Sequence, residues 1–68
     1  MSTPSNARIV RMRELIRMTG LPRSHIYRLQ AEGRFPRSVK LDIRSVGWLE
    51  QEVIDWLDEK IASRDAMR

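Results

Sequence analysis

Apolar residues recur at helical spacing in two neighbouring stretches of this chain. The first covers about residues 12–19 and is followed by Gly20, the residue type that most often closes a helix in the left-handed conformation. The second covers about residues 22–31. It begins with Pro22, whose missing N–H group costs nothing at the first position of a helix, and Gly33 stops it. The pattern predicts two short helices joined by a tight turn.

The period of the apolar residues changes after Gly33. Apolar and polar residues alternate over 39–44, which is typical of a strand, and a second short strand is predicted over 45–49. The two strands form a β-hairpin with its tip near residues 41–44, although the usual Asn-Gly or Gly-Gly turn is missing. The middle of the chain is therefore expected to be a small two-stranded wing.

The helical period returns over about residues 50–63. Acidic residues crowd the first turn of this third helix, where they complement the positive end of the helix dipole. Both tryptophans, Trp48 and Trp56, lie within apolar periodicity, so we expect them to pack in the core rather than to stack on bases. The inner face of the helix is expected to carry four apolar residues: Val53, Ile54, Leu57 and Ile61.

One small domain accounts for the whole pattern. Residues 1–7 are small and polar and are expected to form a disordered tail, residues 8–63 to form the domain, and residues 64–68 to fray. A domain of this size buries only about 60% of its unfolded surface. Because the chain has no cysteine, a single apolar core must supply its stability.

Charge is divided unevenly along the chain. Residues 1–48 hold ten Lys and Arg against three acidic residues, a net charge of +7, whereas residues 49–68 hold three against six, a net charge of −3. Eleven of the thirteen cations are Arg, whose planar fork suits bidentate contacts with phosphate or guanine. We therefore expect a polyanion, double-stranded DNA, as partner of the basic part. The alternative is that the positive charge merely keeps a small protein in solution.

Other chemistries find little support in the sequence. His25 is the only histidine and no cysteine accompanies it, so no metal site is expected. Ser24 and His25 are helix neighbours that project about 100° apart without a third orienting group, which argues against nucleophilic catalysis. We expect no enzyme, no cofactor and no small-molecule ligand. No apolar stretch approaches the roughly 18 residues of a membrane span, and residues 1–7 lack the apolar core of a signal peptide, so a cytoplasmic location is expected.

The predicted order of elements is mainly α with a small β-hairpin: helix, helix, two-stranded wing, helix. This is the order of a winged helix-turn-helix, and the chain resembles the AlpA-type regulators of prophages. The resemblance covers about residues 9–62, and the helix-turn-helix alone would also fit MerR-like activators and phage excisionases. Four segments carry the likeness by occurring together in this order: MTGLPRSHIYRL at 18–29, GRFPRSVKL at 33–41, VGW at 46–48 and VIDWL at 53–57.

The resemblance implies a prophage- or island-associated DNA-binding protein that regulates transcription, in some members by controlling recombinase genes. The recognition helix is expected over residues 22–31, with Arg23 and Arg28 contacting guanine or phosphate, and Ser24 and Tyr27 as hydroxyl donors. The wing cations are expected to contact the backbone or an adjacent minor groove. The full set of candidate DNA-binding residues is Arg23, Ser24, His25, Tyr27, Arg28, Arg37, Lys40 and Arg44.

Two positions depart from the family pattern. Pro22 stands where members often have a capping Ser, and Asp42-Ile43 stands at the wing tip where small residues or Gly are usual. Because one recognition helix seldom supplies enough specificity, we expect dimers or repeated copies on DNA. Two alternatives stay open: an excisionase-like architectural factor that bends DNA, and a protein-interaction module whose basic face is incidental.

Overall fold

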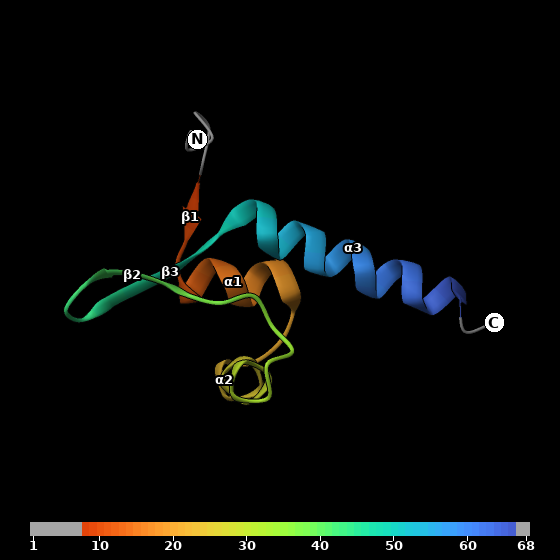
Figure 1. The fold of residues 1–68 in the computed structure, drawn as a ribbon, viewed down its shortest axis with the longest axis horizontal. Helices are drawn as coiled ribbons and strands as arrows, with labels where there is room; N and C mark the ends of the chain where they lie inside the picture. Colours follow the sequence, from red (N-terminus) through yellow and green to blue (C-terminus); the bar gives the residue numbers. More distant parts are fainter. Residues whose placement is uncertain (1–7, 67–68) are drawn as a thin grey trace.

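The computed structural model describes residues 8–66 as three helices and a small antiparallel sheet (Figure 1). The strand order is β1-β3-β2. This confirms the winged helix-turn-helix order and adds one strand before it, whereas the expected tail at residues 1–7 lies outside the described residues. The elements are β1 (Ile9–Val10), α1 (Met12–Thr19), α2 (Arg23–Ala31), β2 (Val39–Asp42), β3 (Ser45–Leu49) and α3 (Glu50–Ala66).

The turn between α1 and α2 is closed by local hydrogen bonds. Gly20 adopts the predicted left-handed conformation, with φ of 73°, and its N–H group donates to the Ile16 carbonyl at 2.8 Å. The Thr19 hydroxyl donates to the Leu15 carbonyl at 2.9 Å and accepts from the Leu21 N–H group at 3.2 Å. These bonds satisfy backbone groups at the end of α1 and fix the direction in which the chain enters α2.

The prediction that Pro22 occupies the first helical position is wrong, because α2 begins one residue later, at Arg23. Pro22 is the N-cap residue, with φ of −71° and an extended ψ of 160°, and its carbonyl accepts hydrogen bonds from the N–H groups of His25 and Ile26, both at 3.1 Å. The φ that proline imposes fits both positions, so the sequence signal does not distinguish them.

Gly33 ends α2 as predicted. Its φ is 72°, its N–H group donates to the Gln30 carbonyl at 3.0 Å, and the N–H group of Arg34 donates to the Leu29 carbonyl at 2.8 Å. This pair of bonds is the pattern that left-handed helix ends form. The chain reverses here and brings Phe35 into the core.

The wing is a hairpin whose turn comprises Ile43 and Arg44, so β2 ends at Asp42 rather than at residue 44. The pairing of β2 with β3 is irregular between Lys40 and Asp42. No non-glycine residue of the described chain has a positive φ, which excludes the turn type that favours Asn-Gly. Asp42 pairs with Ser45 across the turn, and Asp42 Oδ1 accepts a hydrogen bond from the adjacent Ile43 N–H group at 2.8 Å.

Strand β1 ties the start of the described chain to the wing. Ile9 pairs with Leu49 and Val10 with Trp48, and the Arg8 carbonyl accepts a hydrogen bond from the N–H group of Glu50 at 2.8 Å. This strand was not predicted, since two residues cannot display an alternating pattern. It makes β3 the central strand of the sheet.

One apolar cluster holds the elements together, as the size of the chain requires. Trp48 is fully buried, which confirms its predicted place in the core, and Trp56 is half-buried against the same cluster. Every helix and strand except β2 contributes one residue to this core, and the loop after α2 contributes one more. The buried residues are Val10, Leu15, Ile26, Phe35, Trp48 and Val53.

Only the first half of α3 packs against this core. Val53 is buried, and Ile54 and Leu57 are half-buried, but Ile61, which was predicted on the inner face, is 54% exposed. Helix α3 nevertheless continues to Ala66, three residues beyond its predicted end. The apolar pattern of α3 therefore extends beyond the part of the helix that is covered, because no other element of residues 8–66 reaches its distal half (Figure 1).

Gly47→Ala is expected to destabilise the fold by about 1–3 kcal/mol through overpacking. A Cβ atom at position 47 would collide with Cγ2 of Ile9 and lie 3.1 Å from the Val10 carbonyl oxygen. Urea denaturation followed by circular dichroism measures the loss. The double variant Ile9→Ala/Gly47→Ala should regain part of the stability relative to the sum of the single changes, and strict additivity would contradict the proposed collision.

Candidate nucleic-acid interface

The burial of Ile26 determines which side of α2 faces outward. This side chain is fully buried and Leu29, one turn later, is half-buried, so residues on the other side of the helix project away from the domain. Tyr27 is 50% exposed and His25 is half-buried. The structure thus places the five candidate residues of α2 at its surface: Arg23, Ser24, His25, Tyr27 and Arg28.

Two of these side chains contact each other. Nη2 of Arg28 lies 3.0 Å from Nε2 of His25, at the i, i+3 spacing that makes helix residues neighbours. Because a guanidinium group carries only donors, Arg28 donates and the His25 nitrogen accepts. The contact restrains the guanidinium group on the outer face of α2. The i, i+3 spacing was visible in the sequence, but the pairing was not predicted.

The N-terminus of α2 is open to an anion. Its N-cap residue, Pro22, makes no side-chain hydrogen bond to the first turn, and that turn contains no acidic residue. The first N–H groups of a helix lack partners within the helix and carry the positive end of its dipole, so they favour a phosphate group. Because the N–H groups of His25 and Ile26 donate to the Pro22 carbonyl, the donors that remain for a ligand are the N–H groups of Arg23 and Ser24.

The three wing cations lie on a separate element. Arg37 precedes β2, Lys40 lies within β2, and Arg44 lies in the turn. All three side chains are exposed, and within residues 8–64 none of them forms an ion pair with an acidic group. The contact between His25 and Arg28 is the one side chain–side chain hydrogen bond that joins two of the eight candidate residues.

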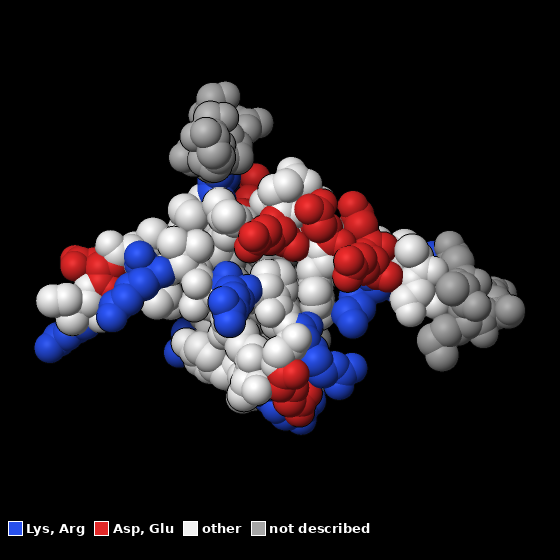
Figure 2. Space-filling model, viewed as in Figure 1, with Lys and Arg blue, Asp and Glu red and all other residues white. Residues whose placement is uncertain are grey.

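Positive and negative side chains occupy different parts of the surface (Figure 2). Most Lys and Arg of this view lie on the hairpin and around α2, at the left and lower side, whereas most Asp and Glu lie over α3 at the upper right. The basic side is interrupted by Asp42 on the hairpin and Glu32 at the end of α2. The basic first part of the chain and its acidic last part therefore form different regions of the surface. A polyanion is attracted to the α2 and hairpin side and repelled by the α3 side.

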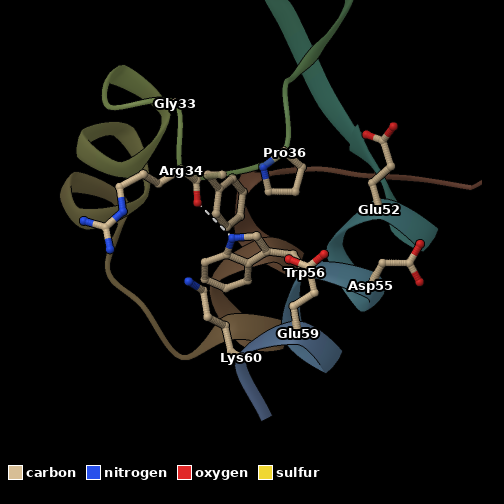
Figure 3. Close-up of a pocket in the computed structure, with 9 residues that line it drawn as sticks. Gly33, Arg34, Pro36, Glu52, Asp55, Trp56, Glu59 and Lys60 are labelled. Carbon is tan, nitrogen blue, oxygen red and sulfur yellow. Dashed lines mark hydrogen bonds between the residues drawn. The ribbon is translucent and has the colours of Figure 1, made fainter. Parts of the chain in front are cut away.

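Trp56 joins α3 to the loop that follows α2 (Figure 3). Its indole Nε1 donates to the Arg34 carbonyl at 2.9 Å, its ring meets the edge of Phe35 at a centroid distance of 4.8 Å, and Lys60 Nζ lies 5.1 Å above it. This indole is engaged in packing, as predicted, and is not presented to a base. The hydrogen bond to Arg34 and the ring contact with Phe35 fix the end of α2 relative to α3.

A shallow groove of about 510 Å³ opens beside Trp56. Three carboxylates line it: those of Glu52 and Asp55 point away from Trp56 in Figure 3, and that of Glu59 lies beside the indole. Their negative charge makes this side unsuitable for a nucleic acid. The complete lining is Gly33, Arg34, Phe35, Pro36, Glu52, Asp55, Trp56, Glu59 and Lys60.

Within residues 8–66, no helix combines the length and the apolar character needed to cross a membrane. In the same part, no three His, Asp or Glu side chains come together in an arrangement that could hold a metal ion.

Two helices joined by a tight turn, a β-hairpin and a third helix define a winged helix-turn-helix domain, and one side of this domain is predominantly basic. The family profile described as prophage CP4-57 regulatory protein (AlpA) matches residues 8–61. The chain belongs to this AlpA family of regulatory proteins, and the match confirms the resemblance found in the sequence. The family is a class of regulators and not a class of enzymes.

Two relatives show how far the similarity extends. The chain is 42% identical over 57 residues to the uncharacterized protein ORF88 of Enterobacteria phage P4, covering 84% of this chain and 65% of that protein. It is 33% identical over 66 residues to the DNA-binding transcriptional activator AlpA of Escherichia coli strain K12, covering 88% of this chain and 94% of that protein. The chain thus spans just under two thirds of the phage protein. No solved structure matches it significantly.

Proposed function

We propose that this protein is a sequence-specific regulator of transcription that inserts α2 into the major groove of double-stranded DNA. The observation that carries the proposal is the outward face of α2, which presents two arginines, two hydroxyl groups and an open helix N-terminus on the basic side of the domain. The name of the Escherichia coli relative, a DNA-binding transcriptional activator, supports it.

The dimensions of α2 suit the major groove. Its nine residues span about 13 Å, and the groove is about 12 Å wide. In this arrangement the helix N-terminus and Ser24 bind phosphate, while Arg28, restrained by His25, reaches the edge of a base. Arg23 contacts guanine or phosphate, and Tyr27 donates its hydroxyl group to either.

The wing provides a second, less specific contact. Arg37, Lys40 and Arg44 are exposed cations without acidic partners in the described chain, so they bind the backbone beside the recognition site. The phage origin of one relative and the name of the family support an association with a prophage or a mobile island.

More than one copy is expected on each regulatory site. A single short recognition helix reads only a few base pairs, so useful specificity requires dimers or repeated copies. The spacing between half-sites in bound DNA measures the arrangement. A footprint of one half-site at saturating protein concentration would contradict this part of the proposal.

Selection of bound duplexes from a random pool at physiological salt tests the function. We expect the wild-type chain to enrich one motif and the variant Arg23→Ala/Arg28→Ala to lose it while retaining weak binding through its other cations. The charge-matched control Lys60→Ala/Arg64→Ala, on the acidic helix, should retain the motif. If the wild-type chain enriches no motif, sequence-specific recognition is excluded and an interaction module becomes the better explanation.

A further inference from the structure

The wing ends in an apolar side chain that nothing in the domain covers. Ile43 is 84% exposed, the largest fraction among the exposed apolar residues of the described chain, and Leu41 beside it is 44% exposed. Turn positions usually hold glycine or short polar residues. The fold therefore does not account for an isoleucine at this position.

The hairpin holds Ile43 in a defined place. The N–H group of Ile43 is bound by Asp42 Oδ1 at 2.8 Å, and the other end of the hairpin is anchored by the fully buried Trp48. Figure 1 shows the hairpin extending from the body of the domain as an arm. The hydrogen bond holds the backbone at Ile43, and a β-branched side chain has few rotamers, so its insertion into a partner costs little conformational entropy.

The charges around Ile43 indicate which partner it fits. Lys40 and Arg44 flank it as exposed cations that form no ion pair within residues 8–64, and Asp42 is the only acidic residue of β2, the turn and β3. An apolar side chain between cations is the combination with which architectural proteins enter the minor groove. The exposed apolar surface of the tip involves too few residues for a stable protein interface of about 800 Å² on each partner.

We propose that Ile43 is a wedge that enters a minor-groove base step beside the site of α2 and bends the DNA. The side chain partly unstacks two base pairs, while Lys40 and Arg44 bind the phosphates on either side. This inference rests on the proposed function and adds a change of DNA shape to it. It also predicts a preference for easily kinked TA or CA steps at a fixed distance from the recognised motif.

Energy transfer between dyes at the two ends of a duplex that carries the selected motif measures the bend, and fluorescence anisotropy of the same samples measures affinity. We expect a kink of about 20–90° with the wild-type chain. Ile43→Ser should lose most of it and Ile43→Leu should keep it. Ile61→Ser, which removes an exposed apolar side chain from α3, is the matched control and should bend DNA like the wild type. Circular dichroism verifies that each variant is folded.

Asp42→Asn provides a second measurement. It keeps the oxygen that accepts the Ile43 N–H group but removes a negative charge that would face phosphate, so binding should tighten without loss of the bend. Unchanged affinity would place the tip away from the backbone and overturn the wedge.

The outcomes separate the two proposals. Equal bending by the wild type and Ile43→Ser overturns the wedge, as does motif-specific binding by the wild type without any bend, and both results leave the proposed function standing. A chain that binds no duplex overturns the proposed function and the wedge together.

Discussion

Trp48→Ala is expected to leave the chain largely unfolded at 25 °C. The indole is the largest fully buried side chain, and it lies on the central strand opposite Val10. Removing a buried tryptophan costs about 3–5 kcal/mol. The core of a domain below 70–80 residues supplies roughly 3–5 kcal/mol in all. The loss therefore equals the whole expected stability, and far-UV circular dichroism in the absence of denaturant should show it directly.

Two further variants make this prediction specific. Ile61→Ala also shortens an apolar side chain, but the residue is 54% exposed, so its denaturation midpoint should barely move. The stability of Trp48→Phe should lie between those of Trp48→Ala and the wild type. The change leaves a smaller void than alanine does, and it removes an indole Nε1 that has no hydrogen-bond partner in the structure. A native spectrum and an unchanged midpoint for Trp48→Ala would contradict the assigned core.

Arg28→Ala is expected to weaken binding to the selected motif by about 1–3 kcal/mol, the value of one good bidentate contact. This corresponds to roughly a five- to 150-fold rise in Kd at 25 °C. The residue is exposed, and the only hydrogen bond of its side chain in the described chain is to His25, so the fold should be unaffected. Titration of a labelled duplex at fixed salt concentration measures the change, with a scrambled duplex alongside.

The controls for Arg28 distinguish shape from charge. Arg28→Lys keeps the charge but loses the fork, so it should recover nonspecific affinity more than motif specificity. Lys60→Ala removes one positive charge from α3 and should alter both affinities little. His25→Ala releases the restraint on the guanidinium group and should have a smaller effect than Arg28→Ala. If Arg28→Ala binds the motif as tightly as the wild type, Arg28 does not belong to the contact set.

The sequence predicts α1 and the two glycine stops accurately because their causes are local. Residues 12–19 carry their own apolar stripe, and the left-handed conformation of Gly20 and Gly33 depends only on the backbone at those positions. Two other features could not be predicted because they depend on contacts between residues that are distant in the sequence. Strand β1 depends on partners at positions 48 and 49, and the exposure of Ile61 depends on the absence of a covering element in the described chain.

The outward-facing residues of α2 could be predicted from the sequence, but not the contacts that these residues make. The inner stripe of α2, Ile26 and Leu29, indicates which of its residues face outward, and the structure agrees. The restraint of Arg28 by His25 and the open cap at Pro22 needed coordinates, since both depend on side-chain or backbone angles that residue types leave undetermined. The isolated position of Ile43 likewise follows from the shape of the hairpin.

The pairing of β1 with β3 affects how this protein folds during its synthesis on the ribosome. Strand β1 is made early, but its partners Trp48 and Leu49 are synthesised almost forty positions later. At about 5–20 residues per second, the first half of the chain waits roughly 2–8 s for the strand that completes its core. During this interval Val10, Leu15 and Ile26 have no closed sheet to cover them, so the nascent polypeptide is a substrate for chaperones and proteases. The cellular amount of this protein should therefore depend on translation speed as well as on the stability of its folded state.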